Sequence, residues 1–301
     1  MRGRHPAPPP PRAVPQGVRN WVHTPKREHC RLTAPDRKRM ASQMLAAMQD
    51  GVAPLQPGMT PVVMVVVGTP GSGKTTVART VARGWYGADG RNHFVDVDLD
   101  DAINFHPQGP ALWNLRDAAT GEALPVGSTE TFFLCRDEAI EVMREVVRSQ
   151  LLASNRPRYS LVLYRNKGAS VTLRAAKRLG WHTVLLYVGV PREVATRRAH
   201  DRGPRQGRFF SAEDVAYWYA FVHEGVAFWA LAADEFLLVD NRRDRGDTEP
   251  PPVVRRVAMH GDGNWEERLR AAQEAVDAVS PPPDRSRTQR DRTLLAGLLP
   301  S

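Results

Sequence analysis

Apolar and polar positions follow two different periods along the middle of this sequence. Residues 62–67 form an unbroken run of valine and methionine, which is typical of a buried central strand. Further on, Val77, Ala78, Val81 and Ala82 recur at the spacing of one helix face. The sequence therefore predicts a strand over 62–67 that is followed by a helix.

The same two periods alternate through the rest of the chain. They predict further strands at residues 94–98, 160–164, 183–190 and 236–240. They predict helices at residues 36–50, 135–152, 171–179, 191–200, 211–231 and 262–279. Ser211 and the acidic residues after it form a capping signal at the start of the helix over 211–231. This alternation predicts an α/β fold with a mainly parallel sheet and helices on both faces.

The two ends of the chain differ in composition from its middle. Residues 1–35 are rich in proline and arginine, which predicts a disordered basic tail. Residues 281–301 form a second polar tail, so the folded domain is predicted to span residues 36–280. The net charge is +9, and residues 1–40 contribute ten lysines or arginines against two acids. We interpret the basic tail as a solvated extension, with contact to nucleic acid or to an acidic partner as the alternative.

The two cysteines, Cys30 and Cys135, lie far apart and in unlike contexts. They predict neither a disulfide framework nor a metal cluster, which fits a reducing compartment. No apolar run approaches the ~20 residues that a membrane-spanning helix needs. The first residues also lack the apolar core of a secretory signal. We therefore expect a cytoplasmic protein without membrane contact.

A phosphate-binding loop follows the first predicted strand. The pattern G-x-x-x-x-G-K-[ST] is complete, with Gly68, Gly73, Lys74 and Thr75 at the required spacing. Glycines let the backbone curl around a phosphate and point successive N–H groups at it. The alternative is a glycine-rich turn without a ligand, and the flanking strand and helix argue against it. The sequence therefore predicts a nucleoside triphosphate site.

The residues of this loop have distinct predicted roles. Lys74 would bridge the β- and γ-phosphates of ATP as a point charge, and Thr75 would place its hydroxyl on Mg²⁺. The N-terminus of the following helix would add its positive dipole to the same anion site. The predicted ATP-binding residues are Gly68, Thr69, Pro70, Gly71, Ser72, Gly73, Lys74, Thr75 and Thr76.

The strand over 94–98 brings carboxylates to the sheet edge at which ligands of parallel α/β proteins bind. Asp96 and Asp98 are two residues apart and so point to the same side of a strand; Asp100 joins them if the strand stays extended. A kinase needs one carboxylate to accept the proton of the substrate hydroxyl and often another to organise Mg²⁺. The alternative is an acid-rich helix start at Asp100 and Asp101.

Arginines are concentrated after the strand over 183–190, at Arg197, Arg198, Arg202, Arg205 and Arg208. Gly-Pro and Gln-Gly pairs among them predict a short mobile loop. Such a lid closes arginines over a transferring phosphoryl group and excludes water. Surface charge and nucleic-acid contact are the alternatives, although few aromatic residues interleave with these arginines.

Taken in order, these motifs resemble the zeta toxin family of P-loop kinases. The resemblance rests on the phosphate loop, on Asp98-Leu99-Asp100 followed by His106-Pro107, and on the arginine lid. It extends to Glu138, to Val190-Pro191 and to Val239-Asp240-Asn241, and it covers residues 60–241. The resemblance implies transfer of the γ-phosphate of ATP, with Mg²⁺, to a sugar hydroxyl of UDP-N-acetylglucosamine.

The resemblance also implies which residues carry out the transfer. Asp100 would be the base on the substrate hydroxyl, and Asp98 would assist it and join Thr75 at Mg²⁺. Arg202 and Arg208 would neutralise the transferring group, and Lys74 would bind phosphates beside them.

On the acceptor side, the resemblance implies that Glu138 contacts the sugar-nucleotide, and Asn166 is predicted to bind the substrate as well. A toxin system would add an antitoxin-like protein partner, which would contact the helix over 36–50. That helix has one apolar face, which carries Met40, Met44, Leu45 and Met48. We interpret this face as core packing, with a groove-binding surface for a partner as the alternative.

One strand end departs from the family pattern. Where the third strand of the family usually ends in a carboxylate, this chain has Tyr164, and Arg165 and Lys167 make the same edge more cationic. Two other hypotheses therefore stay open: a P-loop kinase of a nucleoside, an antibiotic or a polynucleotide end, and a non-catalytic ATP-binding regulatory protein. Asp98 and Asp100 discriminate between catalysis and binding, because a protein that only binds ATP needs no base facing the γ-phosphate.

Overall fold

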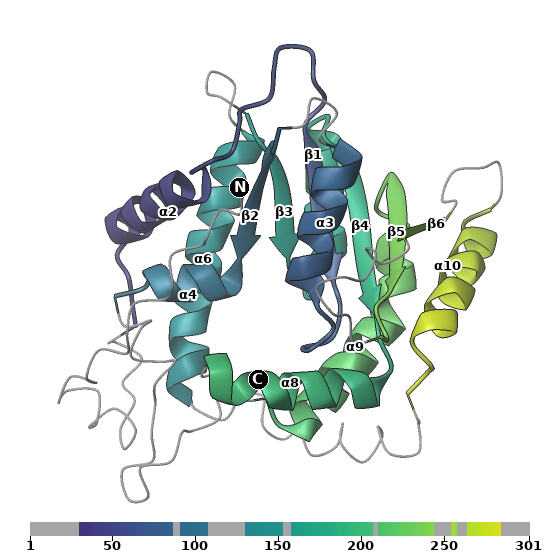
Figure 1. The fold of residues 1–301 in the computed structure, drawn as a ribbon. Coiled ribbons are helices and arrows are strands. Elements are labelled where there is room, and N and C mark those ends of the chain that lie inside the picture. The colour runs from purple at the N-terminus through teal and green to yellow at the C-terminus, as the bar shows by residue number, and fades with distance from the viewer. Residues whose placement is uncertain are drawn as a thin grey trace, which may run out of the picture.

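A six-stranded sheet forms the centre of the fold (Figure 1). The computed structural model describes residues 30–86, 91–107, 130–152, 158–206, 210–243, 254–257 and 264–283. The strands are β1 (Val62–Val67), β2 (Phe94–Asp98), β3 (Ser160–Tyr164), β4 (His182–Gly189), β5 (Glu235–Asp240) and β6 (Val254–Val257). Their order across the sheet is β2-β3-β1-β4-β5-β6. Neighbours from β2 to β5 pair in parallel, and β6 is antiparallel to β5.

Helices cover both faces of this sheet. They are α2 (Ala34–Met48), α3 (Lys74–Tyr86), α4 (Leu99–Phe105), α6 (Glu130–Leu151), α7 (Ala169–Arg178), α8 (Arg192–Gln206), α9 (Ala212–Ala230) and α10 (Trp265–Val279). The apolar side chains of α3 pack on one face, whereas those of α2, α6, α7, α9 and α10 pack on the other. Figure 1 shows α3 crossing in front of the central strands. The predicted α/β fold, with a mainly parallel sheet and helices on both faces, is confirmed.

Strand β1 is buried along its whole length because it lies between β3 and β4 and under helices on both faces. Val63, Val65 and Val67 pack into the cluster on one face, and Met64 and Val66 pack into the cluster on the other. This alternation follows from the two-residue period of a strand. Burial on both faces explains why the run carries no polar residue.

The predicted strands are all present, with bounds that agree to within one residue. Helix α9 also begins as predicted, because Oγ of Ser211 accepts from the backbone N–H of Asp214 at 3.0 Å and the Asp214 carboxylate accepts from the N–H of Ser211 at 3.2 Å. The pattern did not predict β6, and it gave α4 only as the alternative of an acid-rich helix start at Asp100 and Asp101. Both are short, and a few residues give too little of a period to identify an element.

The described chain begins with a packed segment rather than a free tail. Cys30 and Leu32 are buried in the core, and Thr33 caps α2 by accepting a hydrogen bond from the N–H of Asp36 at 3.3 Å. Met40 and Met44 of α2 are also buried there, which confirms that its apolar face serves core packing. The rest of the two predicted tails, residues 1–29 and 284–301, lies outside the described residues. Among the described helices, none is both long and apolar enough to cross a membrane.

Candidate functional site

The predicted phosphate loop lies at the carboxyl end of β1, between that strand and α3. Gly71 and Gly73 have φ angles of 83° and 84°, in the left-handed region that favours glycine. A Cβ atom on Gly73 would stand 2.6 Å from Nδ2 of Asn241, and one on Gly71 would collide with the carbonyl oxygen of Ala195. The loop therefore lies directly against α8 and the end of β5.

Two side chains of the loop have the chemistry to bind an anion. Nζ of Lys74 donates hydrogen bonds to the carbonyl oxygens of Gly68, at 2.8 Å, and Thr69, at 3.0 Å. Oγ of Ser72 is fully buried and has no hydrogen-bond partner among the described residues. An unsatisfied buried hydroxyl destabilises a fold, and a phosphate oxygen in the loop would satisfy it. Because α3 begins at Lys74, its positive N-terminal dipole faces the same loop.

Asn166 contacts the phosphate loop itself. Its Oδ1 accepts from the backbone N–H of Gly68 at 3.0 Å, and its Nδ2 donates to the carbonyl oxygen of Gly68 at 3.1 Å. Both polar atoms of the amide are thus engaged with one loop residue. Its predicted contact with a substrate stays a prediction.

Asp96 belongs to a local charge network. Nε of Arg79 on α3 donates to one oxygen of Asp96 at 2.7 Å, and the hydroxyl of Tyr164 donates to the other at 3.1 Å. Burial, followed by the negative charge of Asp96, raises the pKa of Tyr164, so its phenol stays protonated and donates. The tyrosine that departs from the family pattern therefore binds a neighbouring strand carboxylate.

Strand β2 ends at Asp98 and α4 begins at Leu99, so the strand does not stay extended to Asp100, and the alternative of an acid-rich helix start is the one that the structure bears out. The chain turns into a helix whose first turn carries Asp100 and Asp101, where carboxylates interact favourably with the helix dipole. Asp98 is half-buried at the carboxyl edge of the sheet. The side chain of Asp100 lies outside the described residues. The roles of Asp98 and Asp100 in catalysis stay predictions.

Thr75 lies in the first turn of α3 and is half-buried. In the described parts of the chain, no three residues of His, Cys, Asp or Glu gather as they would to hold a metal ion. Mg²⁺ that accompanies a nucleotide keeps several waters and needs only one or two protein ligands. Thr75 with Asp98 stays the predicted pair.

Glu138 on α6 is engaged by the N-terminal helix. Nη1 of Arg37 on α2 lies 3.0 Å from Oε2 of Glu138, and the Glu138 side chain is 19% exposed. The predicted acceptor contact of this carboxylate would therefore compete with an existing ion pair.

The arginine-rich segment is helical over most of its length. Helix α8 continues through Gly203 and Pro204 to Gln206, so the prediction of a loop at the Gly-Pro pair was wrong. A proline inside a helix lacks an N–H donor and crowds the carbonyl group four residues earlier, so this continuation runs against the local breaking signal. Arg202 is half-buried on α8, whereas Arg208 and the side chain of Arg205 lie outside the described residues. The predicted roles of Arg202 and Arg208 are not tested by this geometry.

Arg198 joins α8 to the chain after β5. Its Nη1 donates to the carbonyl oxygen of Asn241 at 2.8 Å, and its Nη2 donates to that of Arg243 at 2.7 Å. The side chain of Asn241 in turn donates from Nδ2 to the carbonyl oxygen of Ser72 at 2.8 Å. The sequence had indicated Asn241 only as part of a family motif, although its position just after a parallel strand is a signal for a site residue.

The two cations after β3 differ in their surroundings. Arg165 turns toward α7, where Nη1 donates to Oγ1 of Thr172 at 3.1 Å, and burial followed by the charge of Arg144 lowers its pKa. Nζ of Lys167 lies 5.5 Å from the ring centroid of Trp218 on α9. Of the two positive side chains at this edge, Arg165 thus contacts α7 and Lys167 contacts α9.

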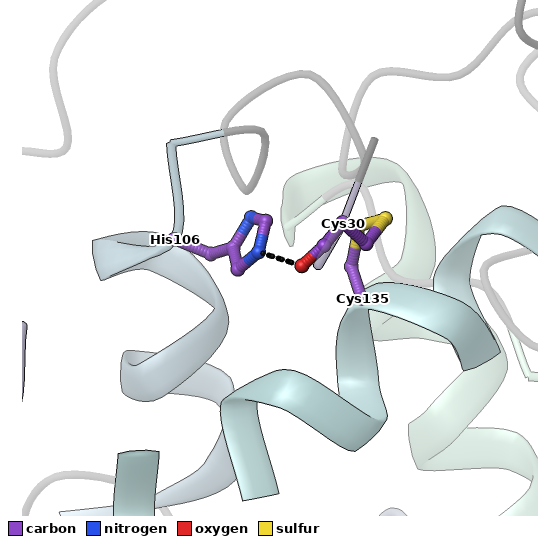
Figure 2. Close-up of a disulfide and its surroundings, with 3 residues drawn as sticks. All are labelled: Cys30, His106 and Cys135. Carbon is purple, nitrogen blue, oxygen red and sulfur yellow. Dashed lines mark hydrogen bonds between the residues drawn. A yellow bond between two sulfur atoms is a disulfide. The ribbon is translucent and has the colours of Figure 1, made fainter. Parts of the chain in front are cut away.

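A disulfide joins Cys30, just before α2, to Cys135 on α6 (Figure 2). The prediction of no disulfide was wrong because folding brings the two Cα atoms to 4.8 Å across a sequence separation of 105 residues. Figure 2 also shows Nε2 of His106 bonded to the carbonyl oxygen of Cys30, at 3.0 Å. His106 is buried, which lowers its pKa and favours the neutral ring. The bond therefore requires the tautomer with hydrogen on Nε2.

A family model described as Zeta toxin matches residues 46–245 of the chain. None of the curated proteins compared with the sequence matches it. The match spans the phosphate loop, β2, Glu138, α8 and Asn241.

Solved structures are similar to this chain over most of its length. One comes from the PezAT chromosomal toxin–antitoxin system of Streptococcus pneumoniae, with a TM-score of 0.51, 15% identity, and coverage of 89% of this chain and 98% of that one. Two others are AvrRxo1-ORF1–AvrRxo1-ORF2 complexes at 12% identity. The complex with sulphate ions has a TM-score of 0.48 and covers 91% of this chain and 92% of that one. The complex with ATP has a TM-score of 0.46 and covers 89% and 87%. At this identity the PezAT structure supports the fold alone.

Proposed function

The chain belongs to the zeta toxin family, and on that premise we propose that it transfers the γ-phosphate of ATP to a hydroxyl of a nucleotide-sugar such as UDP-N-acetylglucosamine. Its kinase-type character follows from the family and the P-loop fold. The nucleotide-sugar as acceptor and Mg²⁺ as cofactor are the finer parts of the proposal.

The phosphate loop is the observation that carries this proposal. It combines glycines that leave no room for a Cβ, a buried Ser72 hydroxyl without a described partner, and the Lys74 ammonium on loop carbonyls. When ATP binds, Lys74 would exchange those carbonyl oxygens for phosphate oxygens, and Thr75 would orient Mg²⁺. The exchange of hydrogen-bond partners at Lys74 and the placement of Mg²⁺ at Thr75 both take place within the loop and the first turn of α3.

The residues at the carboxyl edge would then direct the transfer. Asp100, assisted by Asp98, would accept the proton of the acceptor hydroxyl as its oxygen bonds to the γ-phosphorus. The bond from that phosphorus to the bridging oxygen breaks, leaving ADP. Arg202 and Arg208 would neutralise the charge on the transferring group and help to exclude water. Glu138 and Asn166 would contact the acceptor.

The direct test is an assay with purified protein, ATP and Mg²⁺, with and without UDP-N-acetylglucosamine, that follows product mass. The proposal expects the sugar-nucleotide to gain one phosphoryl group. Asp100→Asn should abolish the transfer while ATP still binds, because the amide cannot accept the proton. Equal activity in that variant would overturn the assignment of the base.

ATP turnover with a nucleoside, an antibiotic or a polynucleotide end, and none with the sugar-nucleotide, would keep the kinase and replace its acceptor. ATP binding without any phosphorylated product would favour a regulatory ATP-binding protein. Arg37 forms an ion pair with Glu138, the residue that is predicted to contact the sugar-nucleotide. A different acceptor is therefore the first alternative to screen.

We further propose that an antitoxin-like protein neutralises this chain, since the PezAT structure belongs to a toxin–antitoxin system. The buried methionine face of α2 is not its docking surface. We also propose a kinase domain over 36–280 with a solvated basic tail, for which nucleic-acid contact is the alternative, and a cytoplasmic place of action, where ATP is available.

A further inference from the structure

Two asparagines outside the phosphate loop hold it from opposite sides. Asn166 follows β3 and pairs both its amide atoms with the backbone of Gly68, where the loop begins. Asn241 follows β5 and donates from Nδ2 to the carbonyl oxygen of Ser72, near the end of the loop. Since β1 lies between β3 and β4, these two contacts approach the loop from the two halves of the sheet.

The Asn241 contact determines which way one loop peptide points. A trans peptide directs its C=O and N–H groups to opposite sides. With the carbonyl of Ser72 turned to Asn241, the N–H of Gly73 in the same peptide points away from Asn241. In a phosphate loop the inward N–H groups bind the anion. Asn241 therefore supports the orientation on which anion binding depends.

The backbone of Asn241 is itself held by β4 and by α8, the helix that carries the arginines. Its backbone N–H donates to the carbonyl oxygen of Gly189 at 2.9 Å, and its carbonyl oxygen accepts from Nη1 of Arg198 at 2.8 Å. Ala195, one turn earlier on α8, faces Gly71 so closely that a Cβ on that glycine would collide with it. Helix α8 thus reaches the loop directly through Ala195 and indirectly through Arg198 and Asn241.

We propose that Arg198 and Asn241 are positioning residues that couple helix α8 to the phosphate loop. Through these two residues, the position of α8, which carries Arg202, is fixed relative to the phosphate loop. This inference rests on the proposed function, because it assigns the coupling to ATP binding. Neither residue needs to touch the nucleotide; each acts by orienting the Ser72–Gly73 peptide.

The test measures ATP affinity by calorimetry for the full chain and its variants, together with the melting temperature. Asn241→Ala should weaken ATP binding roughly threefold to tenfold, the range for one neutral hydrogen bond. Asn241→Asp should weaken it further, because it keeps the size but places a carboxylate against the Ser72 carbonyl. The KM for the acceptor should stay unchanged in both.

Asn264→Ala is the matched control. Asn264 caps α10 by accepting from the N–H of Glu267 at 3.0 Å, far in sequence from the loop. It should lower the melting temperature and leave the ATP affinity unchanged. A general loss of stability is thereby separated from a loss of loop orientation.

The coupling itself is tested by a double-mutant cycle. Arg198→Ala and Asn241→Ala together should weaken ATP binding no more than Asn241→Ala alone, because both act on the same peptide. Arg198→Lys keeps the charge but replaces the planar guanidinium, whose two Nη atoms each reach a different carbonyl oxygen, by a single nitrogen, and it should resemble Arg198→Ala. The Arg198→Lys variant also tests the coupling if the Asn241→Ala variant does not fold.

The outcomes separate this inference from the proposed function. A wild-type chain that does not bind ATP would overturn both. A wild-type chain that binds ATP, with unchanged affinity in Asn241→Ala and Arg198→Lys, would overturn the coupling and leave the proposed function standing. Additive effects in the cycle would also overturn it.

Discussion

Three residues beside the candidate site form one hydrogen-bonded network across α3, β2 and β3. Arg79 donates to Asp96 at 2.7 Å and Tyr164 donates to the same carboxylate at 3.1 Å. The side chains of Arg79 and Asp96 are 40% and 26% exposed, so solvent screens this ion pair and its contribution is small. The network engages both oxygens of Asp96, and the catalytic roles of Asp98 and Asp100 stay predictions.

Tyr164→Phe is expected to lower the free energy of unfolding by about 1 kcal/mol at neutral pH, because Asp96 loses a half-buried hydrogen bond. Burial and Asp96 raise the pKa of Tyr164, so the folded chain keeps a proton that the unfolded chain loses. This contribution is therefore complete below about pH 10, the ordinary value for tyrosine, and is lost as the pH rises further. Urea unfolding across this range would measure it.

The exposed Tyr217 provides the control, since Tyr217→Phe should leave the unfolding free energy unchanged at neutral pH. The difference between wild type and Tyr164→Phe should shrink above about pH 10. A difference that stays constant there would contradict the raised pKa of Tyr164.

At the scale of elements, the segment that contains α2 is tied to α6 at two points. The disulfide joins Cys30 to Cys135, and the Arg37–Glu138 ion pair lies one helical turn further along α6. His106, at the end of α4, adds its bond to the carbonyl of Cys30. The N-terminal segment, α4 and α6 are therefore connected beside the predicted acceptor side of the site.

Reduction of this disulfide is expected to lower the free energy of unfolding by about 2–5 kcal/mol, because the unfolded chain regains the freedom of a long closed loop. Thermal unfolding with and without reductant would measure the loss. The double variant Cys30→Ser/Cys135→Ser should melt like the reduced protein and should not respond to reductant.

Thiol counting in the denatured protein provides the independent check on this prediction. Two free thiols in protein purified without reductant, with a melting temperature that does not depend on reductant, would show that the bond does not form in solution. The same thiol count on protein taken from cytosol tests whether the disulfide is present in that compartment, because cytosolic thiols are normally kept reduced.

Elements also differ in how far the sequence predicts them. The run over β1 is predicted because a strand buried on both faces must be apolar at every position. The residue at which β2 ends is harder to predict, because aspartates are favourable both at the carboxyl end of a strand and in the first turn of a helix. Helix α8 continues through Gly203 and Pro204, although both residues are local breaking signals in the sequence.

At the scale of the whole molecule, ATP binding should stabilise the fold, because the phosphate loop that would bind ATP is assembled only in the folded chain, against α8 and the ends of β3 and β5. ATP at about 100 times its dissociation constant should raise the free energy of unfolding by about 2.7 kcal/mol. Lys74→Ala should remove most of this gain, because the phosphates lose their cation. Melting curves with and without ATP would measure both.

Lys177→Ala is the control for this measurement. Lys177 pairs with Asp234 at 2.5 Å on the surface between α7 and the start of β5. Its loss should change the melting temperature slightly and leave the ATP-dependent gain intact. An equal ATP-dependent gain in Lys74→Ala would contradict the predicted role of the lysine.

The sequence by itself determined strands β1 to β5, the class of the fold, the phosphate loop and the family, because each depends on a local pattern of neighbouring residues. It did not determine the partners of those residues. Asn241 meets Ser72 across 169 residues, and Cys30 meets Cys135 across 105. Such contacts depend on the path of every strand and helix between them, which no local period encodes. Only the tertiary structure therefore decided that a disulfide closes the N-terminal segment onto α6 and that α8 holds the phosphate loop through one asparagine.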